Sequence, residues 1–470
     1  MVPFLTVLVG LWSAGPAPGP SLEVVADTVR PRHATLGGWD RRVRRAVWDR
    51  GGSYGGLYHD RGVLRHWTPE MDHEYDIDLV SIRPSLADDA AFYASGVGFR
   101  TSAGSVTTVR FAIETELRAA TPLVGPLGLE ASVVQQEDPQ ADRSFVELAY
   151  LVDVGAGHRL GVRHSFASRK MDLDAEVVYR YGGRGLDAEV SAGRLDLVNN
   201  VVHETLNPIP QQADTLRVYD RAPYWLAGRL SAPLGPLRLE AVGGATPTSR
   251  ARVRSQTDDR VRFAFESGFA YAGGLVEAEV WGPALVVGAT ARATRSVTAR
   301  ETPPGAADPA DYTARQAEVD GGLFALGRWR AFRAEAEWRR THRTDRQEGA
   351  AFGGSSVGGP YAIDERWTWT RLRLDWTSGR TRGPTLGAEY VGALRRFPDD
   401  ADLEELRREV MPAFVNPSHH RVSARIGFRF SPRADVMFGA SLDLDLDPLP
   451  VAFRAPRTYD GAFVRLRALW

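Results

Sequence analysis

The chain has 470 residues, with 58 Lys and Arg against 59 Asp and Glu, and it contains no cysteine. The lack of cysteine excludes disulfide frameworks, thiolate metal sites and cysteine nucleophiles, and the balanced charge gives no field that would attract nucleic acid. A content of 47 glycines and 10% aromatic residues favours tight turns and half-buried strands over a helical bundle.

Residues 1–20 are predicted to be a secretory signal peptide. An apolar run over residues 2–12 is followed by a small, Pro-rich stretch over residues 13–20, which is the order of a hydrophobic region and its exit. No Lys or Arg precedes this run, which is consistent with a truncated start. No later stretch approaches the roughly 18 uncharged apolar residues that a spanning helix needs, so any membrane crossing must use strands.

Residues 21–75 are expected to form a separate N-terminal segment, plug-like or periplasmic. Apolar residues recur there at helical spacing, with arginines on the remaining faces, and predict a short amphipathic helix over residues 38–50. The apolar positions are Trp39, Val43, Ala46 and Val47. The segment is too short for the plug domain of a TonB-dependent transporter. A small insert in the lumen or at the periplasmic mouth is the expectation.

Residues 76–470 are predicted to form an outer-membrane barrel. From about residue 89 the sequence repeats stretches of alternating apolar and polar residues separated by breaks, a period of two that is typical of strands. In residues 107–119, for example, Phe111 and Ile113 share one face while Glu114 and Glu116 share the other. The fold class predicted is all-β: a transmembrane antiparallel up-and-down β-barrel of about 18 strands, within 16–20, after a short partly helical segment. Residues 261–281 could be one long bulged strand or two.

The connections separate this fold from a water-soluble sandwich, because they alternate between short and long along most of the chain, as in outer-membrane barrels. Short breaks are predicted at 121–126, 155–158, 182–185, 233–236, 281–283, 327–329, 378–384 and 431–434. Long, polar connections are predicted at 199–221, 296–315, 344–365, 396–420 and 445–458. Two short turns are near copies, PLVGPLGLEA from Pro122 and PLGPLRLEA from Pro233, which indicates a repeated hairpin unit.

The last predicted strand, residues 459–470, places Val464, Leu466 and Trp470 on one face and Arg465 and Arg467 on the other. An alternating strand that ends on an aromatic residue is typical of the signal that outer-membrane proteins present to the barrel-insertion machinery. Trp470 is therefore predicted to be an insertion signal.

The chain resembles uncharacterised outer-membrane barrel families of Bacteroidota-type bacteria, among them one labelled only as a domain of unknown function (DUF6850). The resemblance rests on the stretch WDRGGSYGGLYHDRG beginning at Trp48, just ahead of a barrel of this length, and on the aromatic terminus. The architecture is also similar to capsule-assembly barrels of the Wzi type, which have a small N-terminal helical part. Neither resemblance implies catalytic residues.

If the apolar face of the strands meets lipid, the other face lines the lumen, and that face is rich in ions. These charged side chains can form a constriction that selects solutes by charge, or a salt-bridged network that stiffens and fills the barrel. The predicted lumen-lining residues are Arg333, Glu335, Glu337, Arg339, Arg425, Arg429, Asp443, Asp445, Arg465 and Arg467.

No motif for catalysis or for a metal stands out, and neither an enzyme nor a cofactor is expected. The acidic stretches around Asp400 and Asp445 match no calcium loop, and the adjacent His419 and His420 point to opposite faces of a strand. His164 and Ser165 are adjacent too, which argues against a shared catalytic site.

The first functional hypothesis is a porin-like passive channel for small hydrophilic solutes in the bacterial outer membrane. The alternative is a surface assembly or adhesion barrel with a blocked lumen, which binds polysaccharide or a partner protein through its long outer loops. The partners expected are outer-membrane lipid, the barrel-insertion machinery and small solutes or surface polysaccharide, with no nucleic acid.

Overall fold

The computed structural model describes the following residues: 33–50, 84–106, 110–138, 141–167, 173–183, 185–198, 215–255, 260–304, 311–349, 361–378, 382–396, 398, 418–431, 433–444 and 461–469. The chain divides into Met1–Pro31 and Arg32–Trp470, and every described residue belongs to the second unit. The predicted signal peptide, most of the stretch from Trp48 that carries the resemblance, and the predicted signal at Trp470 lie outside the described residues.

Two helices precede the strands, α2 (Gly37–Arg50) and α5 (Leu86–Tyr93). The strands are β1 (Val97–Val106), β2 (Arg110–Val124), β3 (Leu127–Asp138), β4 (Ala141–Gly155), β5 (His158–Ala167), β6 (Leu173–Gly183), β7 (Leu186–Val198), β8 (Thr215–Arg221), β9 (Tyr224–Leu234), β10 (Leu237–Ser255), β11 (Val261–Glu279), β12 (Leu285–Glu301), β13 (Tyr312–Trp329), β14 (Phe332–Gly349), β15 (Tyr361–Thr377), β16 (Gly383–Arg396), β17 (Ser418–Ser431), β18 (Ala434–Asp443) and β19 (Gly461–Leu469).

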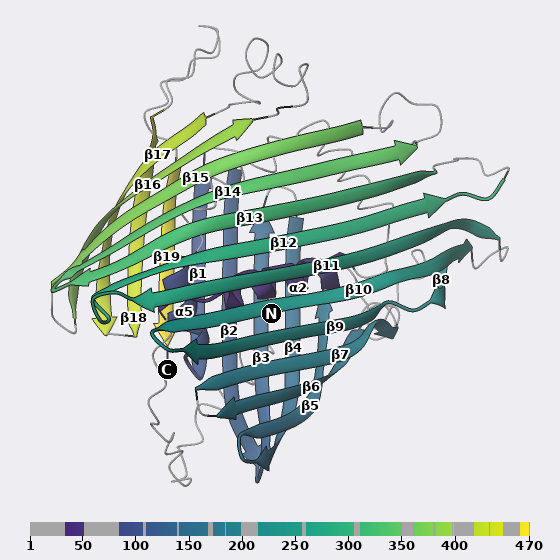
Figure 1. Ribbon diagram of the computed structural model, residues 1–470, viewed down its shortest axis with the longest axis horizontal. Coiled ribbons are helices and arrows are strands. Elements are labelled where there is room, and N and C mark those ends of the chain that lie inside the picture. Colours follow the sequence, from purple (N-terminus) through teal and green to yellow (C-terminus); the bar gives the residue numbers. More distant parts are fainter. Residues whose placement is uncertain are drawn as a thin grey trace, which may run out of the picture. The chain divides into compact units, whose positions relative to one another are not determined.

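These strands form one closed antiparallel sheet (Figure 1). Strand β1 pairs with β2 on one side and with β19 on the other, from Gly98 opposite Leu469 to Val106 opposite Gly461, and this pairing closes the barrel. Strands β8 and β9 pair with successive parts of β10 and together occupy one position in the wall. The described strands therefore fill 18 positions, which confirms the predicted fold class and strand number.

The two ends of the barrel differ in their connections. At one end, here called the short-turn end, hairpins such as β2–β3 and β9–β10 have two-residue turns. Gly125 and Gly235 occupy the same place in these two near-copied turns with φ of +55° and +59°, a left-handed conformation that glycine adopts without strain. The chain enters β1 and leaves β19 at this end, and the longer connections lie at the opposite, long-loop end.

The structure corrects two details of the sequence analysis and decides between the two alternatives that it left open for residues 261–281. Residues 86–93, where strands were expected to begin, form helix α5. The wall strands reach further toward the long-loop end than predicted, because β12 continues to Glu301 and β14 to Gly349. Alternation is lost there since both faces of a strand that extends beyond hydrocarbon can be polar. The stretch from residue 261 is one strand, β11, with unbroken pairing through Gly273 and Gly274.

The wall is polar inside and apolar outside. On β6, Asp174 and Glu176 are buried while Val177, on the other face, is 55% exposed. On β17, Ser423 and Arg425 are buried while Ile426 is 61% exposed. Such an arrangement is unfavourable in water but suits a wall whose outer surface meets hydrocarbon, where a closed sheet also leaves no unpaired backbone edge.

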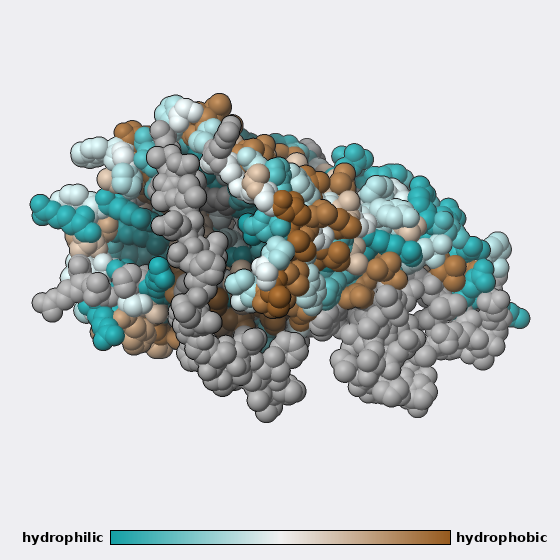
Figure 2. Space-filling model, turned by 90° about the horizontal axis from the view of Figure 1, so that it is seen from below, coloured by the Kyte–Doolittle hydropathy of each residue, from teal (hydrophilic) through white to brown (hydrophobic). Residues whose placement is uncertain are grey.

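Exposed aromatic side chains gather on the outer surface near the short-turn end. Trp329 and Phe332 stack with ring centroids 6.1 Å apart beside the β13–β14 turn, and Trp281 lies at the β11–β12 turn. This is the position of an interfacial aromatic girdle. Figure 2 shows hydrophobic side chains gathered in a brown patch between hydrophilic regions of the surface. Among the described residues, no helix is long and apolar enough to cross a membrane.

Candidate functional site

The described N-terminal residues 33–50 and 84–94, here called the insert, contact the inner face of the barrel wall. In Figure 1 helices α2 and α5 are drawn within the ring of strands. The insert contacts strands on all sides of the barrel, from β10 and β11 to β2, β15 and β19. The helix predicted over residues 38–50 is confirmed as α2.

The extended start of the insert is held by two buried carboxylates of the wall. Glu277 of β11 accepts hydrogen bonds from the backbone N–H groups of His33 (3.3 Å) and Ala34 (2.9 Å). Glu240 of β10 accepts a hydrogen bond from the Thr35 hydroxyl at 2.9 Å. Backbone donors outside a helix need partners when they are buried, and here the wall supplies them.

Helix α2 contacts the wall through charged side chains. Asp40 accepts a hydrogen bond from the Tyr271 hydroxyl at 2.5 Å, and Arg44 lies 3.2 Å from the Asp40 carboxylate. Arg45 pairs at 2.8 Å with Glu116 of β2, whose side chain is fully buried. Arg44 and Arg45 are therefore buried against carboxylates instead of facing solvent.

An apolar cluster lies beside these ion pairs. Ala34, Leu36 and Leu86 of the insert pack on inward-facing side chains of the wall, Val242, Leu275 and Phe324, with Trp39 at the edge. Trp39 lies directly over Gly273, because a Cβ atom at that glycine would come within 2.6 Å of the indole. Apolar residues on a polar lumen wall are thus explained by contact with the insert.

Helix α5 places one carboxylate among four arginines. Ser85 caps the helix by accepting a hydrogen bond from the Asp88 N–H at 3.2 Å. The Asp88 carboxylate lies within ion-pair distance of arginines on three strands, and this group is here called the Asp88 cluster. Its distances are 2.8 Å to Arg373 of β15, 3.4 Å to Arg333 of β14, and 3.2 Å and 3.5 Å to Arg465 and Arg467 of β19.

The charge of Asp88 is strongly favoured in this position. Burial by itself would raise the pKa of the Asp88 carboxyl, but the positive charges of the four arginines, Arg373 foremost, outweigh burial and hold the pKa well below its usual range. Asp88 is therefore a carboxylate at neutral pH, and it balances positive charge that the wall itself leaves in excess at this point.

The neighbouring Asp89 joins the insert to the first two strands. Its carboxylate pairs with Arg100 of β1 at 2.6 Å, and Arg100 in turn pairs with Glu116 of β2 at 2.7 Å. Arg42 of α2 lies 4.0 Å from Asp89, which links the two helices. Gly38 allows this approach, because a Cβ atom there would overlap the Asp89 carboxylate.

Seven of the ten predicted lumen residues fall into two groups. Arg333, Arg465 and Arg467 belong to the Asp88 cluster, while Glu335, Glu337, Arg339 and Arg425 form ion pairs within the wall, such as Arg425 with Asp375 at 2.9 Å. Arg429 is half-buried and lies opposite Asp435 in the register, and Asp435 pairs with Arg467 of the cluster. The backbone of Asp443 lies opposite Arg421, and Asp445 lies outside the described residues.

The sequence analysis missed several residues that hold the insert. Asp88 and Asp89 were overlooked, although a serine followed three residues later by an acidic residue is a known start signal for a helix. The acceptors on strands β2, β10 and β11, Glu116, Glu240 and Glu277, were not singled out either. Alternation placed them on the inner face, but nothing in the local pattern indicates which inward carboxylate meets the insert.

The described residues show no cluster of three or more His, Cys, Asp or Glu side chains suited to a metal ion. His164 stacks on Tyr150, with ring centroids 5.8 Å apart, whereas Ser165 is buried on the inner face. Their opposite orientation agrees with the expectation from the sequence.

A closed antiparallel wall with an apolar outer face, an interfacial aromatic girdle and an ionic interior fits one environment. The chain is an outer-membrane β-barrel. No family model and no curated protein matches its sequence, so the resemblance to the DUF6850 and Wzi-type barrels stays a prediction.

Several solved structures are similar to this barrel at low identity. OccK10 (OpdN) of Pseudomonas aeruginosa is 12% identical over 80% of this chain and 98% of its own, with a TM-score of 0.34. OmpT of Vibrio cholerae is 11% identical over 80% and 98%, with a TM-score of 0.35. CdiB from Acinetobacter baumannii is 8% identical over 80% and 60%, with a TM-score of 0.38. At such TM-scores these likenesses carry no argument about function.

Proposed function

We propose that this protein is a gated outer-membrane channel, closed at rest by its own insert, which passes small hydrophilic solutes only when the insert moves. The observation that carries the proposal is the Asp88 cluster. It joins a helix of the insert to arginines on strands β14, β15 and β19, which are far apart in the sequence. A buried carboxylate with four ionic partners is costly to remove from its place, since each arginine would lose a counter-charge.

The ionic character of the remaining contacts supports a seal that can be released. The insert contacts the wall through Asp40, Arg45, Asp88 and Asp89, and also through two apolar clusters, one around Leu36 and one in which Trp39 and Val43 pack against wall residues. Ion pairs cost less to break than an apolar interface of equal area when water can solvate the separated charges. An insert held in this way can leave the wall without unfolding the barrel, because the pairing of β1 with β2 and β19 does not depend on it.

The test is ion conductance across a planar lipid bilayer. The full chain is compared with a chain that begins at Ser95 and so lacks the insert, after both have been shown to migrate as heat-modifiable folded barrels. The proposal expects almost no current from the full chain and steady current from the shortened one.

The two hypotheses from the sequence make different predictions in the same experiment. Steady current from the full chain would contradict the proposal and support the open, porin-like channel. Silence from both chains would contradict it too, and would support the surface assembly or adhesion barrel.

A further inference from the structure

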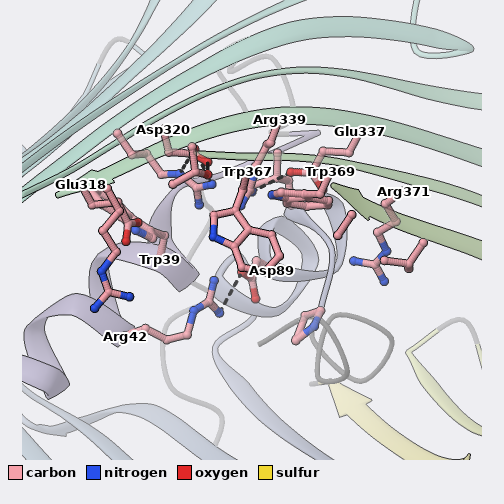
Figure 3. A pocket seen from close by; sticks show the side chains of 17 residues that line it. Trp39, Arg42, Asp89, Glu318, Asp320, Glu337, Arg339, Trp367, Trp369 and Arg371 are labelled. Carbon is pink, nitrogen blue, oxygen red and sulfur yellow. Dashed lines mark hydrogen bonds and ion pairs between the residues drawn. The ribbon is translucent and has the colours of Figure 1, made fainter. Parts of the chain in front are cut away.

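A cavity of about 260 Å³ lies between the insert and the inner wall. The insert contributes Trp39 and Arg42 of α2, Leu86 and Asp89 of α5, and Pro84 just before α5. Strands β12 to β16 supply the other lining residues, with Trp367 and Trp369 of β15 among them. Figure 3 shows Trp367 at the centre of this group with Trp39 and Trp369 on either side. This cavity, here called the outer pocket, is not used by the proposed seal.

The outer pocket lies on the long-loop side of helix α5. Along β14, Arg333 contacts Asp88 near the short-turn end, whereas Glu337 and Arg339 line the pocket further along the strand. Along β15, Arg373 contacts Asp88, and Trp369 lines the pocket nearer the long-loop end. Long loops of outer-membrane barrels lie outside the cell, so the pocket faces the side from which external solutes arrive.

The three tryptophans are held in fixed orientations. Trp367 and Trp369 are two residues apart on one strand and so point to the same face. The guanidinium of Arg339 lies 4.5 Å from the ring centroid of Trp369, and that of Arg292 lies 5.6 Å from a Trp39 ring. Each of these two indoles is therefore held in place by a guanidinium group over its ring.

The charges of the pocket are paired and nearly cancel. Five arginines and four carboxylates line it. Arg292 lies 2.6 Å from Asp320, and Arg339 lies 2.6 Å from Glu337. An ionic ligand would be repelled, because each oppositely charged group that could bind it is paired with a group that carries the ligand's own charge. A purely apolar ligand would remove water from these charged groups and offer no hydrogen bonds in return.

We propose that the outer pocket binds a small neutral saccharide. The C–H face of a sugar ring packs on an indole, and its hydroxyl groups donate to carboxylates such as Glu337 and accept from guanidinium groups such as Arg339. A hydroxyl group both donates and accepts hydrogen bonds, so it can serve paired acceptors and donors at once. The proposal goes beyond gating but requires a docked insert, because Trp39 and Arg42 form one side of the pocket.

The experiment is calorimetric titration of the full chain, refolded in detergent, with a panel of sugars. The neutral members are glucose, galactose, mannose, N-acetylglucosamine, maltose and lactose, and the charged members are glucuronate and glucosamine. We expect saturable binding of at least one neutral sugar with Kd of about 1 mM or tighter, and weaker binding of both charged sugars.

Two variants locate the binding. Trp369→Ala removes a pocket indole and should weaken binding at least about tenfold. Trp329→Ala is the matched control, because this tryptophan is 65% exposed on the outside of the barrel, and it should leave binding unchanged. If Trp369→Ala fails the heat-modifiability test for folding, Glu337→Gln, which keeps the shape of the side chain, takes its place with the same expectation.

Three results would overturn the proposal: no binding by any neutral sugar, tighter binding of a charged sugar than of every neutral one, or unchanged affinity in the pocket variant. Failure of gating is recognised separately. If the full chain conducts steadily yet binds a neutral sugar through Trp369, the gating proposal fails and the pocket proposal stands.

Discussion

Replacing Asp88 by asparagine removes the negative charge that helix α5 presents to Arg333, Arg373, Arg465 and Arg467. Asp88 is only 5% exposed, so water cannot replace it while the insert stays docked. Removal of one partner of a buried ion pair costs about 3–5 kcal/mol. We take the lower end, because Arg373 also pairs with Asp375 and Arg467 with Asp435.

A cost of about 3 kcal/mol lowers the ratio of docked to released insert about a hundredfold. Single-channel recording of Asp88→Asn in planar bilayers should therefore show an open fraction about a hundred times that of the unmodified chain. Asp435→Asn is the matched control. It removes a buried carboxylate of strand β18 that pairs at 2.5 Å with one of the same arginines, Arg467, and that belongs to the wall and not to the insert.

The reasoning would be refuted if Asp88→Asn stayed as silent as the unmodified chain. It would also be refuted if Asp435→Asn raised the open fraction equally, since the effect would then come from a loosened wall and not from release of the insert. A change in the heat-modifiable migration of either variant would identify a folding defect, and conductance is compared only between folded barrels.

Three other perturbations test the same structure. The pKa of Asp88 is lowered in the docked state. The contribution of Asp88 to docking is therefore fully present above the ordinary carboxyl pKa of about 4, and it is lost as the pH falls through the lower pKa of the docked state. Conductance of the full chain should stay minimal down to about pH 4 and rise only in stronger acid. Gly273→Ala places a Cβ atom 2.6 Å from Trp39, whereas the Cβ atom of Gly274→Ala meets nothing within 4 Å. Gly273→Ala should therefore weaken docking of the insert by about 1–3 kcal/mol and raise conductance. Equal effects of the two variants would contradict the packing of Trp39 on Gly273. Ile426→Arg puts a charge on the lipid face and should cost about 2–4 kcal/mol in urea titrations of the barrel folded in vesicles; an unchanged midpoint would mean that Ile426 does not face hydrocarbon.

The wall could be predicted because its information is local. The alternation of Val177 and Tyr179 with Asp174 and Glu176 specifies which face meets lipid, and it needs no partner strand to be recognised. The near-copied turns at Gly125 and Gly235 mark hairpins in the same local way. Even the amphipathic helix α2 follows from the spacing of Trp39 and Val43.

The docking of the insert could not be predicted in this way, because its contacts join residues that are distant in the chain. Asp88 meets Arg465, 377 residues later, and Ala34 meets Glu277, 243 residues later. Many wall strands offer inward carboxylates or arginines, so many pairings satisfy the sequence equally well. Only closure of the barrel fixes which of them face the insert.

The sequence by itself determined a closed barrel of about 18 strands with an ionic interior, since alternation over many strands has one solution in lipid, where no sheet edge can stay unpaired. The tertiary structure decided what that interior contains. It brought Asp88 among four arginines and Trp39 opposite Trp367 and Trp369. These contacts depend on the shape and register of the closed wall, which a period of two along each strand does not encode.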